Sequence, residues 1–72
     1  MNKPIFKKII IFGVGLIGGS FALALRKANA VQEVVGFGRS AATLEQARQL
    51  GLIDRIGADV AREVRDADLI LL

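Results

Sequence analysis

The sequence contains no cysteine and no histidine. Without cysteine, the chain can form neither a disulfide framework nor a cysteine-ligated metal site. Without histidine, it lacks the commonest general base and the commonest metal ligand. We therefore expect no metal site in this chain and assign no catalytic residue to it.

No charged residue occurs from Ile9 to Leu25, and basic residues precede this run, as they do in signal peptides. The run is shorter than the roughly 20 apolar residues that a bilayer-spanning helix needs. It also contains four glycines between residues 13 and 19, and each costs a helix interior about 1 kcal/mol relative to alanine. We therefore predict neither export nor membrane insertion, and we expect a cytoplasmic protein.

Positive charge is in excess, with a formal net charge of +3, and Lys3, Lys7 and Lys8 crowd the N-terminus. Such a cluster can indicate contact with nucleic acid or with a membrane surface, but the alternation of aromatic and basic residues that often accompanies nucleic-acid binding is missing. We interpret these lysines as solvated residues that lead into the first strand, and we expect no nucleic-acid partner.

The chain is short and apolar. Seventy-two residues, of which 53% are hydrophobic, amount to about half of a typical domain of 100–150 residues. The final residues 68–72 have the composition of a buried strand. We therefore expect residues 1–72 to be the N-terminal portion of a larger domain.

Four stretches have the composition of β-strands. Residues 7–12 end in a continuous apolar run at residues 9–12, which is typical of a strand buried on both faces, as in a parallel sheet. Further strands are predicted at residues 33–37 and from Asp68 onward. A short, weak strand is predicted within residues 53–57.

Three helical patterns separate these strands. The first is predicted to end at Asn29, and its expected apolar face is Ile17, Phe21, Ala24, Leu25 and Ala28. The second is predicted to begin after the N-cap Ser40 and to end at Gly51, with a buried face of Leu44, Ala47 and Leu50. Asp59 is predicted to cap a brief third helix. This order of elements is that of a doubly wound α/β sheet.

Three glycines, Gly13, Gly15 and Gly18, form a G-x-G-x-x-G string between the first strand and the first helix, the context that a dinucleotide-binding turn requires. Gly13 would permit the tight turn, Gly15 would let a pyrophosphate approach bare backbone, and Gly18 would let helix and strand pack closely. The pyrophosphate would lie on the free N–H groups of the helix N-terminus, where Leu16 and Ile17 stand. The fold class is therefore predicted to be the first half of a Rossmann-type parallel sheet. The simpler alternative is that the glycines serve only a tight turn.

The end of the second strand predicts the type of cofactor. NAD-binding proteins usually carry Asp or Glu about 20 residues beyond the glycine turn, where it binds the ribose hydroxyls. Gly38 stands there in this chain, followed by Arg39 and Ser40. A missing carboxylate removes repulsion toward a 2′-phosphate, and Arg39 offers a planar cation that can pair with it. We predict NADP as the cofactor, with NAD as the alternative, and we expect Arg39 and Ser40 to bind it.

Four aspartates, Asp54, Asp59, Asp66 and Asp68, stand near expected helix ends or turns. Acids at such places are ordinarily helix caps or solvated groups. We interpret all four in that way and assign no acid–base chemistry to them.

The residues from Gly13 to Ser20, Gly-Val-Gly-Leu-Ile-Gly-Gly-Ser, resemble the opening of prephenate and arogenate dehydrogenases, enzymes of tyrosine biosynthesis. The Gly-Leu-Ile-Gly-Gly-Ser part is far more restrictive than the general glycine pattern. Residues 35–40, 49–54 and 67–72 are similar to further segments of that family, so the resemblance covers nearly the whole chain.

This resemblance implies oxidative decarboxylation of prephenate or arogenate, with hydride passing to a nicotinamide cofactor and carbon dioxide leaving. The family's catalytic histidine and substrate-binding arginine lie beyond residue 72, so residues 1–72 alone are expected to be inactive, and the full protein is expected to be a homodimer through its C-terminal domain. Many family members carry Asp where this chain has Gly38. Two alternatives stay open, namely another Rossmann dehydrogenase of the β-hydroxyacid dehydrogenase or pyrroline-carboxylate reductase type, and a non-catalytic nucleotide-sensing module.

Overall fold

The computed structural model describes residues 5–13 and 16–72. Strands and helices alternate along the chain. They are β1 (Phe6–Phe12), α1 (Leu16–Lys27), β2 (Val31–Phe37), α2 (Ala41–Gln49), β3 (Arg55–Ile56), α3 (Val60–Val64) and β4 (Leu69–Leu71). Each predicted strand and helix is therefore present. No helix in the described part of the chain is long and apolar enough to cross a bilayer.

The four strands form one sheet in the order β3-β2-β1-β4, and every neighbouring pair is parallel. At the centre of the sheet, Ile10 of β1 is in register with Val35 of β2 on one side and with Ile70 of β4 on the other. This strand order is the one with which a Rossmann fold begins. The predicted fold class is confirmed as an α/β fold of partial Rossmann type.

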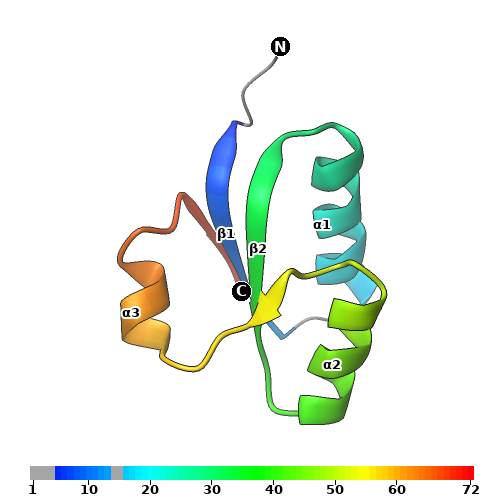
Figure 1. Cartoon of the computed structure of the whole chain (residues 1–72), viewed down its shortest axis with the longest axis vertical. Coiled ribbons are helices and arrows are strands. Elements are labelled where there is room, and N and C mark those ends of the chain that lie inside the picture. The colour runs from blue at the N-terminus through cyan, green and yellow to red at the C-terminus, as the bar shows by residue number, and fades with distance from the viewer. Residues whose placement is uncertain (1–4, 14–15) are drawn as a thin grey trace.

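Helices cover both faces of the sheet. In Figure 1, α1 and α2 lie on one side of β1 and β2, and α3 lies on the other. Successive strand residues point to opposite faces, so Ile9 and Ile11 join the core with α1 and α2, whereas Ile10 joins a second core with Val64 of α3. The continuous apolar run of β1 is therefore explained by burial on both faces.

The predicted apolar face of α1 is correct only in part: Leu25 packs against the core, and the side chain of Ile17 lies outside the described part of the structure. Phe21 is 38% exposed and Ala24 and Ala28 are exposed, whereas Ala22 is only 1% exposed. The reason is a close contact with the chain that follows α2. Gly19 is buried, and a Cβ at Gly19 would lie 3.1 Å from Leu52 Cδ1. Gly19 and Ala22 therefore face the core, because the close approach of Leu52 leaves little room for a side chain at residue 19.

Both long helices end as predicted, in left-handed residues. Asn29 has a φ of 56° and Gly51 a φ of 78°. In each case the next residue donates its N–H to a carbonyl five residues earlier, Ala30 to Leu25 at 2.8 Å and Leu52 to Ala47 at 2.9 Å, which is the Schellman pattern. Leu50, predicted to be buried, is 66% exposed because it lies beyond the last residue of α2.

The predicted N-caps are confirmed. The Ser40 side chain accepts a hydrogen bond from the N–H of Thr43 at 3.2 Å at the start of α2. The Asp59 side chain accepts one from the N–H of Arg62 at 3.3 Å at the start of α3. Both caps place helix N-termini at the edge of the sheet where the parallel strands end.

Candidate functional site

The turn after β1 is built on Gly13. Its φ is 71°, a left-handed conformation that costs most other residues roughly 1–2 kcal/mol. The N–H of Gly13 donates to the carbonyl of Phe37 at 2.7 Å, so the turn is tied to the end of β2. Gly15 lies outside the described residues.

The helix α1 begins at Leu16, directly after this turn, so Leu16, Ile17 and Gly18 form its first turn. The first four N–H groups of a helix have no acceptor within the helix, and the helix dipole makes that end attractive to anions. The backbone therefore supplies, at the predicted position, the donors that the predicted phosphate site needs. The assignment of these three residues stays a prediction.

A cavity of about 720 Å³ opens at the carboxyl edge of β1 and β2. It lies between the start of α2 and the start of α3. Its lining residues are Phe12, Gly13, Phe37, Gly38, Arg39, Ser40, Thr43, Leu44 and Val60. The structure thus brings Gly13, Arg39 and Ser40 together, although the sequence separates them by more than two dozen residues.

The loop after β2 contributes a residue without a side chain, Gly38, and a cation, Arg39, to the lining of this cavity. A Cβ at Gly38 would lie 3.5 Å from Leu44 Cδ2, which is ordinary contact, so packing does not require glycine there. Arg39 is exposed and forms no ion pair within residues 5–13 and 16–72. The Ser40 oxygen accepts from Thr43, but its O–H remains a donor.

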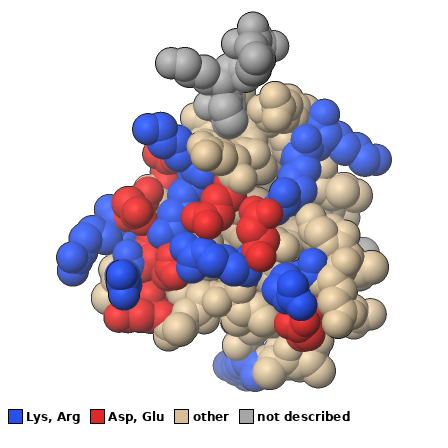
Figure 2. Space-filling view, viewed as in Figure 1, with Lys and Arg blue, Asp and Glu red and all other residues tan. Residues whose placement is uncertain are grey.

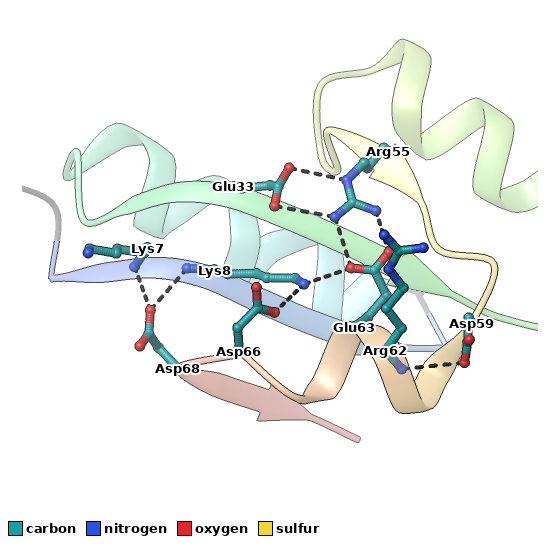
Figure 3. Close-up of polar contacts among 9 residues, drawn as sticks. All are labelled: Lys7, Lys8, Glu33, Arg55, Asp59, Arg62, Glu63, Asp66 and Asp68. Atoms are coloured by element: carbon teal, nitrogen blue, oxygen red, sulfur yellow. Dashed lines mark hydrogen bonds and ion pairs between the residues drawn. The ribbon is translucent and has the colours of Figure 1, made fainter.

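Lys8 contradicts our interpretation of the N-terminal lysines as solvated. Lys8 is 8% exposed, and its Nζ lies 2.7 Å from Glu63 Oε1 and 2.7 Å from Asp66 Oδ1 (Figure 3). The hydrogen bonds to Asp66 and Glu63 raise the pKa of Lys8. The signal was available in the sequence, because strand alternation puts Lys8 on the same face as Ile10 and Phe12.

Arg55 extends these contacts across the sheet. Its Nε lies 3.1 Å from Glu33 Oε2, and its Nη2 donates to Glu63 Oε1 at 2.8 Å. The hydrogen bonds from Arg55 and then Lys8 lower the pKa of Glu63 to about 2. Lys8, Glu33, Arg55, Glu63 and Asp66 form what we call the charged cluster. Figure 2 shows acidic and basic side chains gathered on the α3 side of the molecule.

The charged cluster lies apart from the cavity, since none of its members lines it. Every charge in the cluster has a partner of opposite sign. The described residues also include no group of three or more acidic side chains that could hold a metal ion. We therefore interpret the cluster as structural.

Two aspartates predicted to be caps or solvated groups instead join strands. Asp54 Oδ2 accepts from the N–H of Val34 at 2.7 Å, and Asp68 Oδ2 accepts from the N–H of Lys7 at 2.7 Å and of Lys8 at 3.1 Å. Each aspartate precedes a strand and binds the backbone of the neighbouring one. Asp54 also lies 2.6 Å from Arg26 Nη2. None of these carboxylates lines the cavity.

A parallel sheet with strand order 3-2-1-4, followed by a turn at Gly13 and a cavity at its carboxyl edge, is the arrangement of a partial Rossmann-type α/β fold. Over 68 residues, 94% of this chain, the sequence is 40% identical to cyclohexadienyl dehydrogenase of Zymomonas mobilis subsp. mobilis, covering 23% of that protein. Over 66 residues, 92% of this chain, it is 38% identical to prephenate dehydrogenase of Lactococcus lactis subsp. cremoris, covering 18% of that protein. No family model matches the chain.

Nearly the whole chain is therefore similar to a cyclohexadienyl dehydrogenase and a prephenate dehydrogenase, the kind of protein that the glycine-rich sequence indicated. The chain spans about a fifth of the length of these relatives, 23% of one and 18% of the other. The relatives are dehydrogenases by name, which implies a nicotinamide cofactor in general.

Proposed function

We propose that the full-length protein carries out NAD(P)-dependent oxidative decarboxylation of prephenate or arogenate, and that residues 1–72 are the N-terminal portion of its dinucleotide-binding domain. The observation that carries this proposal is the meeting of the Gly13 turn, the start of α1 and the Gly38-Arg39-Ser40 loop at one edge of a parallel sheet. A nicotinamide bound there would accept the substrate's hydride. The proposal includes a cytoplasmic homodimer.

Each part of the site has a separate task in binding. The N–H groups at the start of α1 would receive the pyrophosphate. The cavity beside Gly13 would hold the adenosine end, because its lining combines apolar side chains with the polar residues Arg39, Ser40 and Thr43. This arrangement supports binding by the chain's own backbone and side chains, while the hydride-transfer residues belong to the remainder of the protein.

We further propose that NADP(H) is preferred over NAD(H). Gly38 leaves the ribose without the usual carboxylate partner, and Arg39 stands next to it, exposed at the cavity. A guanidinium and a phosphate form charge-assisted hydrogen bonds, which contribute more than neutral ones. The 2′-phosphate would therefore gain a partner that the 2′-hydroxyl of NAD(H) does not use.

The test is a cofactor exchange in the full-length protein. Arg39→Ala is expected to weaken NADP(H) binding by about 1.5–3 kcal/mol and to leave NAD(H) binding nearly unchanged. Gly38→Asp is expected to move the preference toward NAD(H), because its carboxylate repels the 2′-phosphate and accepts from the ribose hydroxyls. Isothermal titration with both cofactors measures this. A wild type that strongly prefers NAD(H), with no shift in Gly38→Asp, would contradict the proposed role of the loop.

A further inference from the structure

The backbone conformation of Gly57 does not explain why this residue is a glycine. It follows β3, and its N–H donates to the carbonyl of Gly36 at 2.9 Å. Gly13 and Gly51 are the glycines with positive φ in the described part of the chain, and Gly57 is not one of them. Its φ therefore lies outside the left-handed region that favours glycine, and its surroundings give a different reason for a glycine there.

The surroundings of Gly57 are filled by an aromatic ring. A Cβ at this position would lie 2.2 Å from Phe37 Cζ and 2.6 and 2.7 Å from the two Cε atoms. Carbon atoms that are not bonded to each other rest at about 3.5–4.0 Å. The Phe37 ring therefore occupies the space that any side chain at Gly57 would need.

Phe37 is also part of the candidate site. Its carbonyl accepts the N–H of Gly13, and its ring stacks on Phe12 with centroids 5.2 Å apart. Both rings line the cavity. The Phe37 ring therefore has Gly57 and the Phe12 ring as neighbours, other core residues around it, and the cavity beside it.

We infer that Gly57 is a positioning residue that keeps the cavity open for the adenosine end of a dinucleotide. It acts through Phe37, because the missing side chain at residue 57 leaves the space in which the ring packs outside the cavity. A methyl group at residue 57 would displace the Phe37 ring from this position. The ring would then occupy the part of the cavity that the ligand needs. The identity of the ligand rests on the proposed function, but the packing of the Phe37 ring against Gly57 does not.

The first measurement is a crystal structure of full-length Gly57→Ala without cofactor. We expect the Phe37 ring to lie in the cavity, with the sheet unchanged. A ring that keeps its wild-type position, while the backbone at residue 57 moves away instead, would overturn the inference. This result does not depend on whether the protein binds a dinucleotide, so it separates a failure of the inference from a failure of the proposed function.

The second measurement is a double-mutant cycle with adenosine 2′,5′-bisphosphate and NADP as ligands. Leucine has none of the three ring atoms that meet the Cβ, so Phe37→Leu removes the clash. We expect Gly57→Ala to weaken binding of both ligands by about tenfold or more in the wild-type background and by less than about twofold in the Phe37→Leu background. Equal weakening in both backgrounds would show that residue 57 acts without Phe37 and would overturn the inference.

The two measurements also report on the proposed function. If wild-type protein binds neither ligand while the crystal structure of Gly57→Ala shows the displaced ring, the proposed dinucleotide site is wrong. The packing of Phe37 against Gly57 is then still supported. If wild type binds both ligands and Gly57→Ala binds them equally well, the site stands and the positioning role of Gly57 is wrong.

Discussion

Single glycines are placed in this chain for two different physical reasons. Gly13 and Gly51 have positive φ values of 71° and 78°, and no neighbouring atom would meet a Cβ at either position. Gly19 and Gly57 have neighbours that a Cβ would meet at 3.1 and 2.2 Å. The first pair serves the backbone conformation and the second pair serves packing.

Replacement of Gly13 tests the first reason. We expect Gly13→Ala to lower the free energy of unfolding of the full-length protein by roughly 1–2 kcal/mol, the cost of a left-handed conformation for an L-residue. Gly38→Ala is the matched control, since its Cβ meets Leu44 at an ordinary 3.5 Å, and it should leave stability unchanged or slightly raised. Urea unfolding measures both. Equal midpoints for Gly13→Ala and wild type would contradict the strain argument.

The sequence was sufficient to predict Gly13, Asn29 and Gly51, because turns and helix ends depend on a few adjacent residues. It was not sufficient for Gly57. The need for glycine there comes from Phe37, twenty residues earlier in the chain, and no local pattern reports such a contact. For Lys8, strand alternation indicated the buried face, but its partners Glu63 and Asp66 stand more than fifty residues later in the chain and could not be identified from a local pattern.

At the scale of elements, the charged cluster attaches α3 to the sheet. α3 has only five residues, Val60–Val64, too few to be stable alone. Glu63, on α3, contacts Lys8 of β1 and Arg55 of β3, so one carboxylate connects the helix to two strands. The N-cap Asp59 and the core contact of Val64 complete the attachment.

Acid is expected to weaken this attachment. The pKa of Glu63 is lowered from 4.5 to about 2, so its ionised form stabilises the fold fully above the ordinary pKa. That contribution is lost as the pH falls from about 4.5 toward 2. We expect Glu63→Gln to unfold at lower urea than wild type at pH 7, and the difference should shrink as the pH approaches 2.

Glu45→Gln is the matched control for this experiment, because Glu45 forms an exposed pair with Arg48 within α2, and such pairs contribute little. Its unfolding midpoint at pH 7 should stay close to that of wild type. A Glu63→Gln midpoint that differs from wild type by the same amount at pH 7 and pH 2 would contradict the role given to the ionised carboxylate.

The aspartates that join strands lead to a separate expectation. Asp68 Oδ2 accepts from two backbone N–H groups of β1, so Asp68→Ala should lower the free energy of unfolding by about 1–3 kcal/mol. Asp68→Asn keeps one acceptor oxygen and should recover part of that loss. Thermal or urea unfolding of the two variants measures these changes in stability. Identical stability for Asp68→Ala and wild type would contradict the role of Asp68 in joining the strands.

Element order and the ends of helices could be predicted from sequence, whereas the direction in which α1 faces could not. The spacing of Phe21 and Leu25 indicated one apolar face, and Leu25 does pack against the core. Phe21 is exposed, however, and Ala22, one helical turn after the close contact between Gly19 and Leu52, is buried instead. Hydrophobic periodicity indicates which residues share a face of the helix, but it does not give the distance to the neighbouring element, which decides which side chains fit there.

At the scale of the whole molecule, the site is one edge of a sheet. The strands are parallel, so β1 and β2 end side by side, and Phe12 is in register with Phe37. The residues that follow them, Gly13 and Gly38-Arg39-Ser40, are therefore neighbours at the cavity. The sequence predicted this meeting because strand order and direction follow from the alternation of elements, whereas the cavity's aromatic lining depends on side-chain packing.

Residues 1–72 alone are expected to show no turnover of prephenate or arogenate with NADP. The chain has no histidine, and no carboxylate is among the described residues that line the cavity, so neither group is placed there to act as a general base. The relatives' names refer to proteins of which this chain covers 23% and 18%. Absorbance of the reduced cofactor measures turnover, and a rate above the buffer control would contradict this account.

The central claim is that the glycine turn before α1 receives the pyrophosphate of a dinucleotide. The most direct measurement is cofactor titration of the full-length protein, wild type against Gly15→Val, with circular dichroism of both. We expect saturable binding of NADP(H) by wild type, no measurable binding by the variant, and superimposable spectra, because the isopropyl group would fill the space of the pyrophosphate without disturbing the sheet. Near-normal binding by a folded Gly15→Val variant would contradict the claim.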